Sequence, residues 1–165
     1  IEFHHRPETG TPLKNKWKSE RKPPIRESLR DVIVDYIEAH RHDVTDDHGR
    51  QPLLTTQQGR PAKTTIQRNI YAMTRPCYYT NECPHDRDLD ECDAVGQYNS
   101  ASKCPSSRSP HALRRGAATK NLNDGMPEEM TSDRMDMSPE VLREHYNVQS
   151  QEDKRNLQRR FLNNI

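Results

Sequence analysis

Apolar side chains are scarce in this chain, and their scarcity limits the folds that it can adopt. Hydrophobic residues make up 30% of its 165 residues and aromatic residues 5%, whereas charged residues make up 31%. This length is enough for one ordinary domain, but so few apolar side chains can build only a thin core. We therefore expect either partial disorder or a fold that a partner completes.

Helical spacing of apolar residues is clearest in residues 26–41. One stripe of an amphipathic helix is predicted there, and it consists of Leu29, Val32, Ile33, Tyr36 and Ile37. A second helix is expected to begin at Thr64 or Thr65, which are good capping residues, and to stop before Pro76.

Further helices are expected after residue 108. Two of them begin at the steps Ser109-Pro110 and Ser138-Pro139, because serine caps a helix and proline suits its first position. A short helix between them covers about 127–135, and a last amphipathic helix covers about 151–163.

The amino-terminal part of the chain has the character of strands. Residues 1–5 and 12–18 are expected to be strands joined by a turn at 6–10, and residues 53–56 a further short strand or a buried extended stretch. The predicted fold is therefore mainly α or α+β, with a small N-terminal antiparallel β-sheet followed by a helical bundle. Because a domain rarely begins within a strand, we also expect residues upstream of Ile1.

Charge is distributed unevenly although the net charge is only +1. Residues 1–26 and 103–120 are rich in Lys and Arg, whereas residues 82–93 are strongly acidic. This pattern suits a phosphate-facing surface with a solvated insertion, and random surface charge is the alternative. No run approaches the roughly 20 apolar residues of a membrane span, and no signal peptide is evident. We expect a cytoplasmic protein without membrane contact.

Residues 77–108 show no usable periodicity and are predicted to form a Cys-rich loop insertion. This insertion holds all four cysteines of the chain, Cys77, Cys83, Cys92 and Cys104. A tetrahedral four-thiolate zinc site would fold a stretch that lacks its own core. We therefore predict structural zinc on these thiols, with His85 as a fifth candidate ligand. Free thiols are the alternative, because no Cys-x2-Cys pair is present.

His111 and Arg114 are candidates for phosphate chemistry. Their spacing of three places them on one face of the expected helix near its N-terminus, which itself favours phosphate. Arginine binds phosphate through parallel hydrogen bonds, and histidine transfers protons near neutral pH. Downstream, Tyr146 is a candidate nucleophile. A tyrosine hydroxyl, with a reference pKa of about 10, needs cationic groups and a base nearby before it attacks well.

Together these residues resemble the catalytic domain of tyrosine recombinases, the phage-type and archaeal integrases. Residues 109–119 (SPHALRRGAAT) resemble the T-P-H-x-L-R-H-x-x-A-T helix of that family, and residues 132–146 (SDRMDMSPEVLREHY) resemble its L-G-H-S-S-x-x-x-T-x-x-Y terminus. Residues 14–25 (KNKWKSERKPPI) resemble, more weakly, its lysine-bearing β-hairpin and align the hairpin lysine with Lys16.

The resemblance implies a catalytic domain over residues 1–165 that cuts and rejoins double-stranded DNA through a 3′-phosphotyrosyl intermediate, without a catalytic cofactor. Tyr146 would be the nucleophile, Arg114 would stabilise charge on the phosphate, and His111 would act as acid and base. Lys16 would protonate the leaving 5′ oxygen, with Lys14 or Lys18 as alternatives if the register slips. The family acts as a synapsed homo-tetramer on DNA in the prokaryotic cytoplasm.

Two features depart from the family. Its first arginine, in an upstream R-x-S-E-L helix, has no counterpart here, so the domain is expected to be truncated at its N-terminus and inactive by itself. Its later His or Trp falls on Asp136 or Met137, with Met137 the better fit in spacing. A catalytically inactive, zinc-stabilised DNA-binding or regulatory protein is therefore an alternative. A metal nuclease that uses His85 and the cysteines is a third hypothesis.

Overall fold

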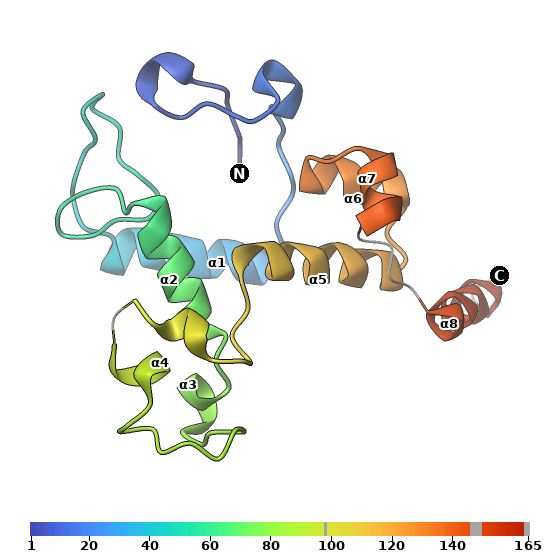
Figure 1. The fold of residues 1–165 in the computed structure, drawn as a ribbon. Helices are drawn as coiled ribbons and strands as arrows, with labels where there is room; N and C mark the ends of the chain where they lie inside the picture. The colour runs from blue at the N-terminus through green and yellow to red at the C-terminus, as the bar shows by residue number, and fades with distance from the viewer. Residues whose placement is uncertain (98, 146–149, 164–165) are drawn as a thin grey trace. The chain divides into compact units, whose positions relative to one another are not determined.

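The computed structural model describes residues 1–97, 99–145 and 150–163, which form helices connected by turns (Figure 1). In chain order the elements are η1 (Pro7–Thr9), η2 (Lys16–Ser19), α1 (Glu27–Asp35), η3 (Tyr36–His40), α2 (Lys63–Met73), α3 (Cys77–Thr80), α4 (Asp93–Gly96), η4 (Ala101–Lys103), α5 (Pro110–Asn123), α6 (Glu128–Met135), α7 (Pro139–His145) and α8 (Gln151–Leu162). The chain divides into two compact units, Ile1–Ala62 and Lys63–Ile165, and each is described by itself. Within the described ranges no helix has the length and hydropathy that crossing a membrane requires.

The predicted amino-terminal β-sheet is wrong, because the described residues contain no β-strand. Antiparallel pairing is limited to isolated bridges, Phe3 with Arg21 and Arg6 with Thr11, whose backbone hydrogen bonds measure 2.9–3.3 Å. The expected second strand instead turns at Lys16, which has a left-handed φ of 56°, and continues as the short 3-10 helix η2. A left-handed residue interrupts extended backbone, so the pairing does not propagate into a ladder.

The expected strand at 53–56 is also absent and leaves a single bridge between Thr56 and Gly59. The helix expected at 26–41 is confirmed as α1, which continues through the π-helical turn η3. Its apolar stripe is only partly covered: Ile33, Tyr36 and Ile37 are half-buried, and none of the residues of α1 or η3 is fully buried. Helical spacing therefore located this helix correctly, although a core does not cover it.

The first unit is tied together by an ion-pair network on Asp46. Its carboxylate accepts hydrogen bonds from the guanidinium groups of Arg50 and Arg60 at 2.8–2.9 Å, and from the backbone N–H groups of His48 and Arg50 at 3.0 Å. Arg50 also donates to the hydroxyl of Thr9 at 2.7 Å. The hydrogen bond from Arg50 is the largest of the effects that hold the pKa of Asp46 well below its usual range.

Acid is therefore expected to destabilise the first unit. A depressed folded-state pKa contributes stability that is complete above the unfolded-state pKa of about 3.9 and is lost as the pH falls toward the folded-state value. We expect the free energy of unfolding to decrease as the pH is lowered from about 4.

Fluorescence of Trp17, the single tryptophan of the chain, reports on this unit during urea unfolding. The decrease should shrink in Asp46→Asn but persist in the control Asp47→Asn, whose side chain is exposed. Equal pH dependence in both variants would contradict this role of Asp46.

The helices predicted for the second unit are present, although α2 begins at Lys63 and not at the predicted capping residues Thr64 or Thr65. The hydroxyl of Ser109 caps α5 by accepting a hydrogen bond from the backbone N–H of Ala112 at 3.1 Å, and Pro110 takes the first helical position. α8 begins with a reciprocal capping box between Ser150 and Asp153. Both starts follow from side-chain chemistry within a few residues, which is why the sequence located them.

The core of the second unit lies where α5, α6 and α7 meet (Figure 1). Ala118 and Leu122 of α5 and Leu142 of α7 are buried there, and Met135 and Met137 pack against them. Three buried apolar residues form a thin core, as the composition predicts. Leu142 is the fully buried residue that joins α7 to this core, and α7 also contacts α6.

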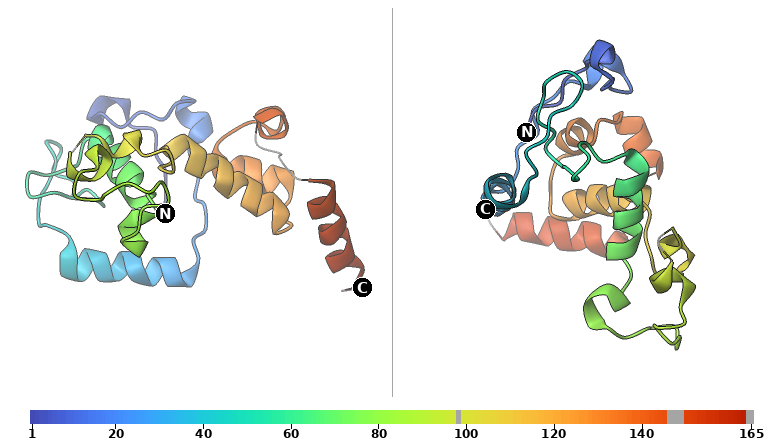
Figure 2. Two further views of the ribbon diagram at one scale, coloured as in Figure 1. Left: turned by 60° about the horizontal axis from the view of Figure 1, so that its bottom comes forward. Right: turned by 90° about the vertical axis from the view of Figure 1, so that its left-hand side faces the viewer.

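α8 lies against the C-terminal end of α5 (Figure 2). Arg160 of α8 donates a 2.6 Å hydrogen bond to the carbonyl of Asn123, the last residue of α5. Gly125 follows with a φ of 92°, and a Cβ atom at this position would lie 3.1 Å from Leu157 Cδ1. Glycine is therefore required here both by the backbone conformation and by the close approach of α8.

Residues 77–108 form an excursion that leaves α2 and returns to α5. Its two ends are joined by a 2.8 Å hydrogen bond from the backbone N–H of Arg108 to the hydroxyl of Thr74. The guanidinium of Arg75 is buried and donates to the carbonyls of Ala72 and Ala94, which ties the end of α2 to α4. The buried residues inside the excursion are small, namely Ala94, Ser100, Ala101 and Cys104.

Candidate functional site

The start of α5 presents two of the predicted site residues. His111 and Arg114 are both exposed in its first two turns. Residues three apart on a helix are neighbours on its surface, so the two side chains share one face, as predicted. The N-terminal end of α5 adds the partial positive charge of a helix N-terminus to this face.

Arg114 is held in place by the end of α6. Its Nη2 donates to the backbone carbonyl of Met135 and, at 3.3 Å, to that of Asp136. Carbonyls at a helix C-terminus carry partial negative charge and attract a guanidinium. Within the described residues Nε and Nη1 have no hydrogen bond, so N–H groups on two nitrogens remain to bind an anion. The contact with α6 thus orients Arg114 without exhausting its donors.

The residues after α6 bear on the predicted position of Met137. Asp136 ends α6 in the left-handed conformation, with a φ of 51°, and the family pattern has glycine at this step. Met137, the next residue, is the one predicted to occupy the position of the family's His or Trp. Met137 is half-buried against the core cluster, and a thioether donates no hydrogen bond. The structure therefore shows Met137 as a packing residue.

Tyr146, the predicted nucleophile, lies outside the described residues. The helix before it, α7, ends at His145 and is fixed on α5 by Leu142, which is fully buried. Arg143 adds a 2.8 Å ion pair with Glu128 of α6. The helix that leads to Tyr146 therefore packs on the same helix that carries His111 and Arg114.

Lys16, the predicted general acid, belongs to the first unit and is exposed at the beginning of η2. The family's turn glycines are absent, and Lys16 itself takes the left-handed conformation. The structure therefore brings together His111 and Arg114, whereas Lys16 is part of a separately described unit.

The four cysteines form no disulfide; Cys104 is buried and the other three are half-buried. Among the described residues, no three His, Cys, Asp or Glu side chains are gathered closely enough to hold one ion. The other candidate ligand, His85, shares a 3.0 Å hydrogen bond with the hydroxyl of Ser106. In this arrangement the four thiols do not surround one point. Zinc binding stays a prediction that metal analysis of the purified protein tests.

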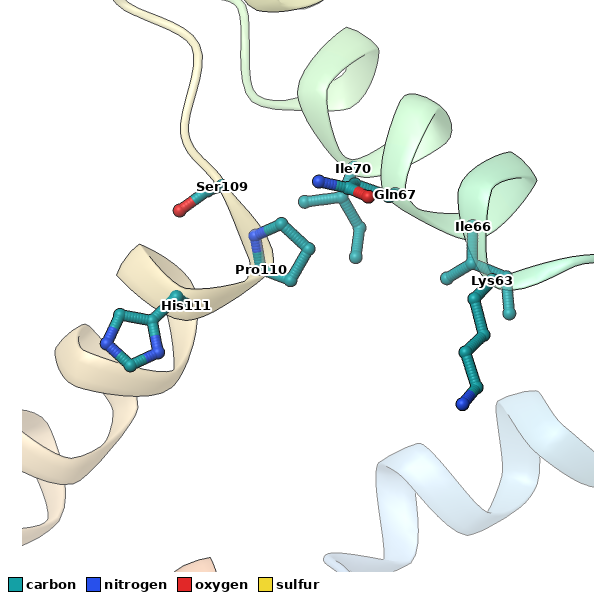
Figure 3. A pocket seen from close by; sticks show the side chains of 7 residues that line it. All are labelled: Lys63, Ile66, Gln67, Ile70, Ser109, Pro110 and His111. Carbon is teal, nitrogen blue, oxygen red and sulfur yellow. The ribbon is translucent and has the colours of Figure 1, made fainter. Parts of the chain in front are cut away.

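An open pocket lies beside His111 and was not predicted from the sequence (Figure 3). It has a volume of about 440 Å³ and lies between α2 and α5, and its lining consists of Lys63, Ile66, Gln67, Ile70, Ser109, Pro110 and His111. The sequence carries no clear signal for this pocket, because the helix is expected to begin at Thr64 or Thr65 and Lys63 is its first residue only in the structure. Spacing could not show that this lysine lies near His111, because the two belong to different helices.

Comparisons with protein-family models, with curated proteins and with solved structures found no match to this chain.

Proposed function

We propose that this chain is the catalytic domain of a tyrosine-type site-specific DNA recombinase, which cleaves and rejoins DNA strands. The observation that carries the proposal is the pair His111 and Arg114 on one exposed face of α5, with Arg114 oriented by the end of α6. The helix that packs on α5 leads directly to Tyr146. The order and spacing of these residues follow the recombinase pattern. Such a protein would act on double-stranded DNA as a homo-tetramer in the cytoplasm of a prokaryote.

In the proposed reaction the Tyr146 oxygen attacks a phosphodiester phosphorus and displaces the 5′ oxygen. His111 takes the proton from the tyrosine hydroxyl, and Lys16 delivers one to the leaving oxygen, which becomes a 5′ hydroxyl. The products are a 3′-phosphotyrosyl bond and a free 5′ end, and the reverse attack by another 5′ hydroxyl rejoins a strand. Arg114 stabilises the negative charge that develops on the phosphoryl oxygens, a contribution that is usually among the largest.

The test is covalent trapping with the natural full-length protein. A duplex nicked beside the cleavage site releases a short fragment after attack, so the phosphotyrosyl adduct accumulates. We expect a denaturation-resistant protein–DNA band with the wild-type protein and none with Tyr146→Phe, because phenylalanine has no nucleophilic oxygen. Tyr78→Phe is the matched control: this tyrosine is exposed in the insertion, and its variant should form the adduct normally. An adduct that survives Tyr146→Phe would refute this assignment of the nucleophile.

A second candidate function is favoured by one observation. Met137 packs on the core at the position where the family has a hydrogen-bond donor, as expected for a DNA-binding or regulatory protein that has lost catalysis. The same experiment separates the two functions. DNA binding by the full-length wild type without any adduct on its own attachment site would support the binding protein.

A further inference from the structure

The pocket between α2 and α5 has a use that the proposed reaction does not require. We propose that it binds the sugar–phosphate backbone of the substrate DNA strand beside the reacting phosphate, with Lys63 as the phosphate contact. This inference rests on the proposed function in taking DNA as the substrate and His111 as a catalytic residue. His111 lines the pocket and is also a proposed catalytic residue, so a strand that reaches His111 would extend into this pocket.

Charge complementarity selects an anionic occupant. Lys63 and His111 line the pocket and no acidic residue does. The N-terminal end of α5, at Ser109 and Pro110, forms part of the wall and adds a partial positive charge. A phosphate in this pocket would therefore meet positive potential from both helices.

Lys63 is also poorly placed for the stability of its own helix. It is the first residue of α2, and no acidic residue is present in that first turn. A cation at a helix N-terminus opposes the helix dipole. Within the part of the chain that the structure describes, the Lys63 side chain is exposed and has no ion pair or hydrogen bond. A residue that is locally unfavourable is expected where function requires it, and a bound phosphate would reverse the unfavourable interaction.

The remaining lining fits a nucleotide strand rather than an isolated anion. Ile70 and Pro110 face each other across the pocket, with Lys63 and His111 on opposite sides of them (Figure 3). An apolar wall between a lysine and a histidine, both of which can donate hydrogen bonds to phosphate oxygens, suits a deoxyribose flanked by phosphates, and the amide of Gln67 can donate a hydrogen bond to either group.

The openness of the pocket favours a polymer over a small ligand. Pockets for small molecules bury about 70–90% of the ligand surface. Here Lys63 and His111 are exposed, and Ile66 keeps 36% of its surface accessible. A continuous strand can cross such a shallow site, since its affinity is the sum of many partly buried contacts along its length.

Salt dependence of DNA binding tests the proposal independently of catalysis. Binding of a fluorescently labelled duplex to the full-length protein is measured by anisotropy over a series of NaCl concentrations. Loss of one phosphate contact reduces the slope of log K against log salt by about 0.9. We expect this reduction in Lys63→Gln and no reduction in Lys154→Gln, which removes the same charge from the exposed surface of α8. Equal slopes for Lys63→Gln and the wild type would overturn the proposal.

A second pair of variants tests the wall of the pocket. Ile66→Glu places a negative charge inside it, whereas Met73→Glu places the same charge on α2 outside it, at a side chain that is 47% exposed. We expect DNA binding to weaken about tenfold or more in Ile66→Glu alone, because like charges facing each other are strongly unfavourable. Equal weakening in both variants would contradict a specific site.

The two proposals fail in different ways. A slope change in Lys63→Gln without any covalent adduct would retain the pocket and reject the recombinase reaction. An adduct with no slope change would retain the reaction and reject the pocket. Absence of DNA binding by the wild-type protein would reject the pocket as a DNA site.

Discussion

Replacement of Arg114 by lysine is expected to lower the rate of covalent adduct formation by about 10²–10³-fold, the usual effect of removing one donor to a developing oxyanion. One nitrogen of the guanidinium is bound to the carbonyls of Met135 and Asp136, and two further donors remain for the phosphate. The ammonium group of lysine is a compact point charge and cannot span both sites. Preserving the charge should therefore not preserve the rate.

The rate is measured by single-turnover trapping of the adduct on the nicked duplex. Arg115→Lys is the matched control, because Arg115 is an exposed neighbour on the same helix and has no place in the proposed reaction. Its adduct should form at close to the wild-type rate. A full rate in Arg114→Lys would mean that charge alone is sufficient and that the α6 carbonyls have no positioning role.

Replacement of Leu142 by alanine should destabilise the second unit by about 2–5 kcal/mol, the range for truncation of a fully buried leucine. Its side chain is 0% exposed and packs with Ala118 and Leu122, which are the only other buried members of this cluster among the described residues. The small side chain of Ala118 can fill little of the cavity that loss of the leucine side chain leaves. The packing of α7 on α5 and α6 should consequently loosen, and adduct formation at Tyr146 should fall as well.

Urea unfolding followed by far-UV circular dichroism measures this effect, since the second unit contributes most of the α-helices. Val141→Ala is the control on the same helix: its side chain is 38% exposed, and the change should cost no more than about 0.5 kcal/mol. If Leu142→Ala and Val141→Ala lowered the unfolding midpoint equally, the cluster would not be what holds α7 on α5.

Prediction from the sequence succeeded where the deciding interactions are local. The start of α5 depends on Ser109 and Pro110, and its end on Gly125, all of which act within one helical turn. The relation between His111 and Arg114 also follows from a spacing of three. These parts of the fold and of the candidate site required no knowledge of distant contacts.

Prediction failed where two segments must pair. Residues 1–5 and 12–18 have strand composition, but a strand is stable only when a partner completes its hydrogen bonds. Here the backbone turns at Lys16 before such pairing extends, and only single bridges form. An alternating pattern indicates which residues suit a strand. It does not indicate whether the free energy of strand pairing exceeds the entropic cost of closing the loop between the strands.

Helix positions, helix ends and the shared face of His111 and Arg114 were determined by the sequence itself, because the interactions responsible span no more than about four residues. The carbonyls that orient Arg114, the packing of Met137 on the core and the neighbourhood of Lys63 and His111 were decided by the tertiary structure. Each of these joins residues from different elements. Such contacts depend on how the few apolar side chains of this chain pack together, which no local pattern encodes.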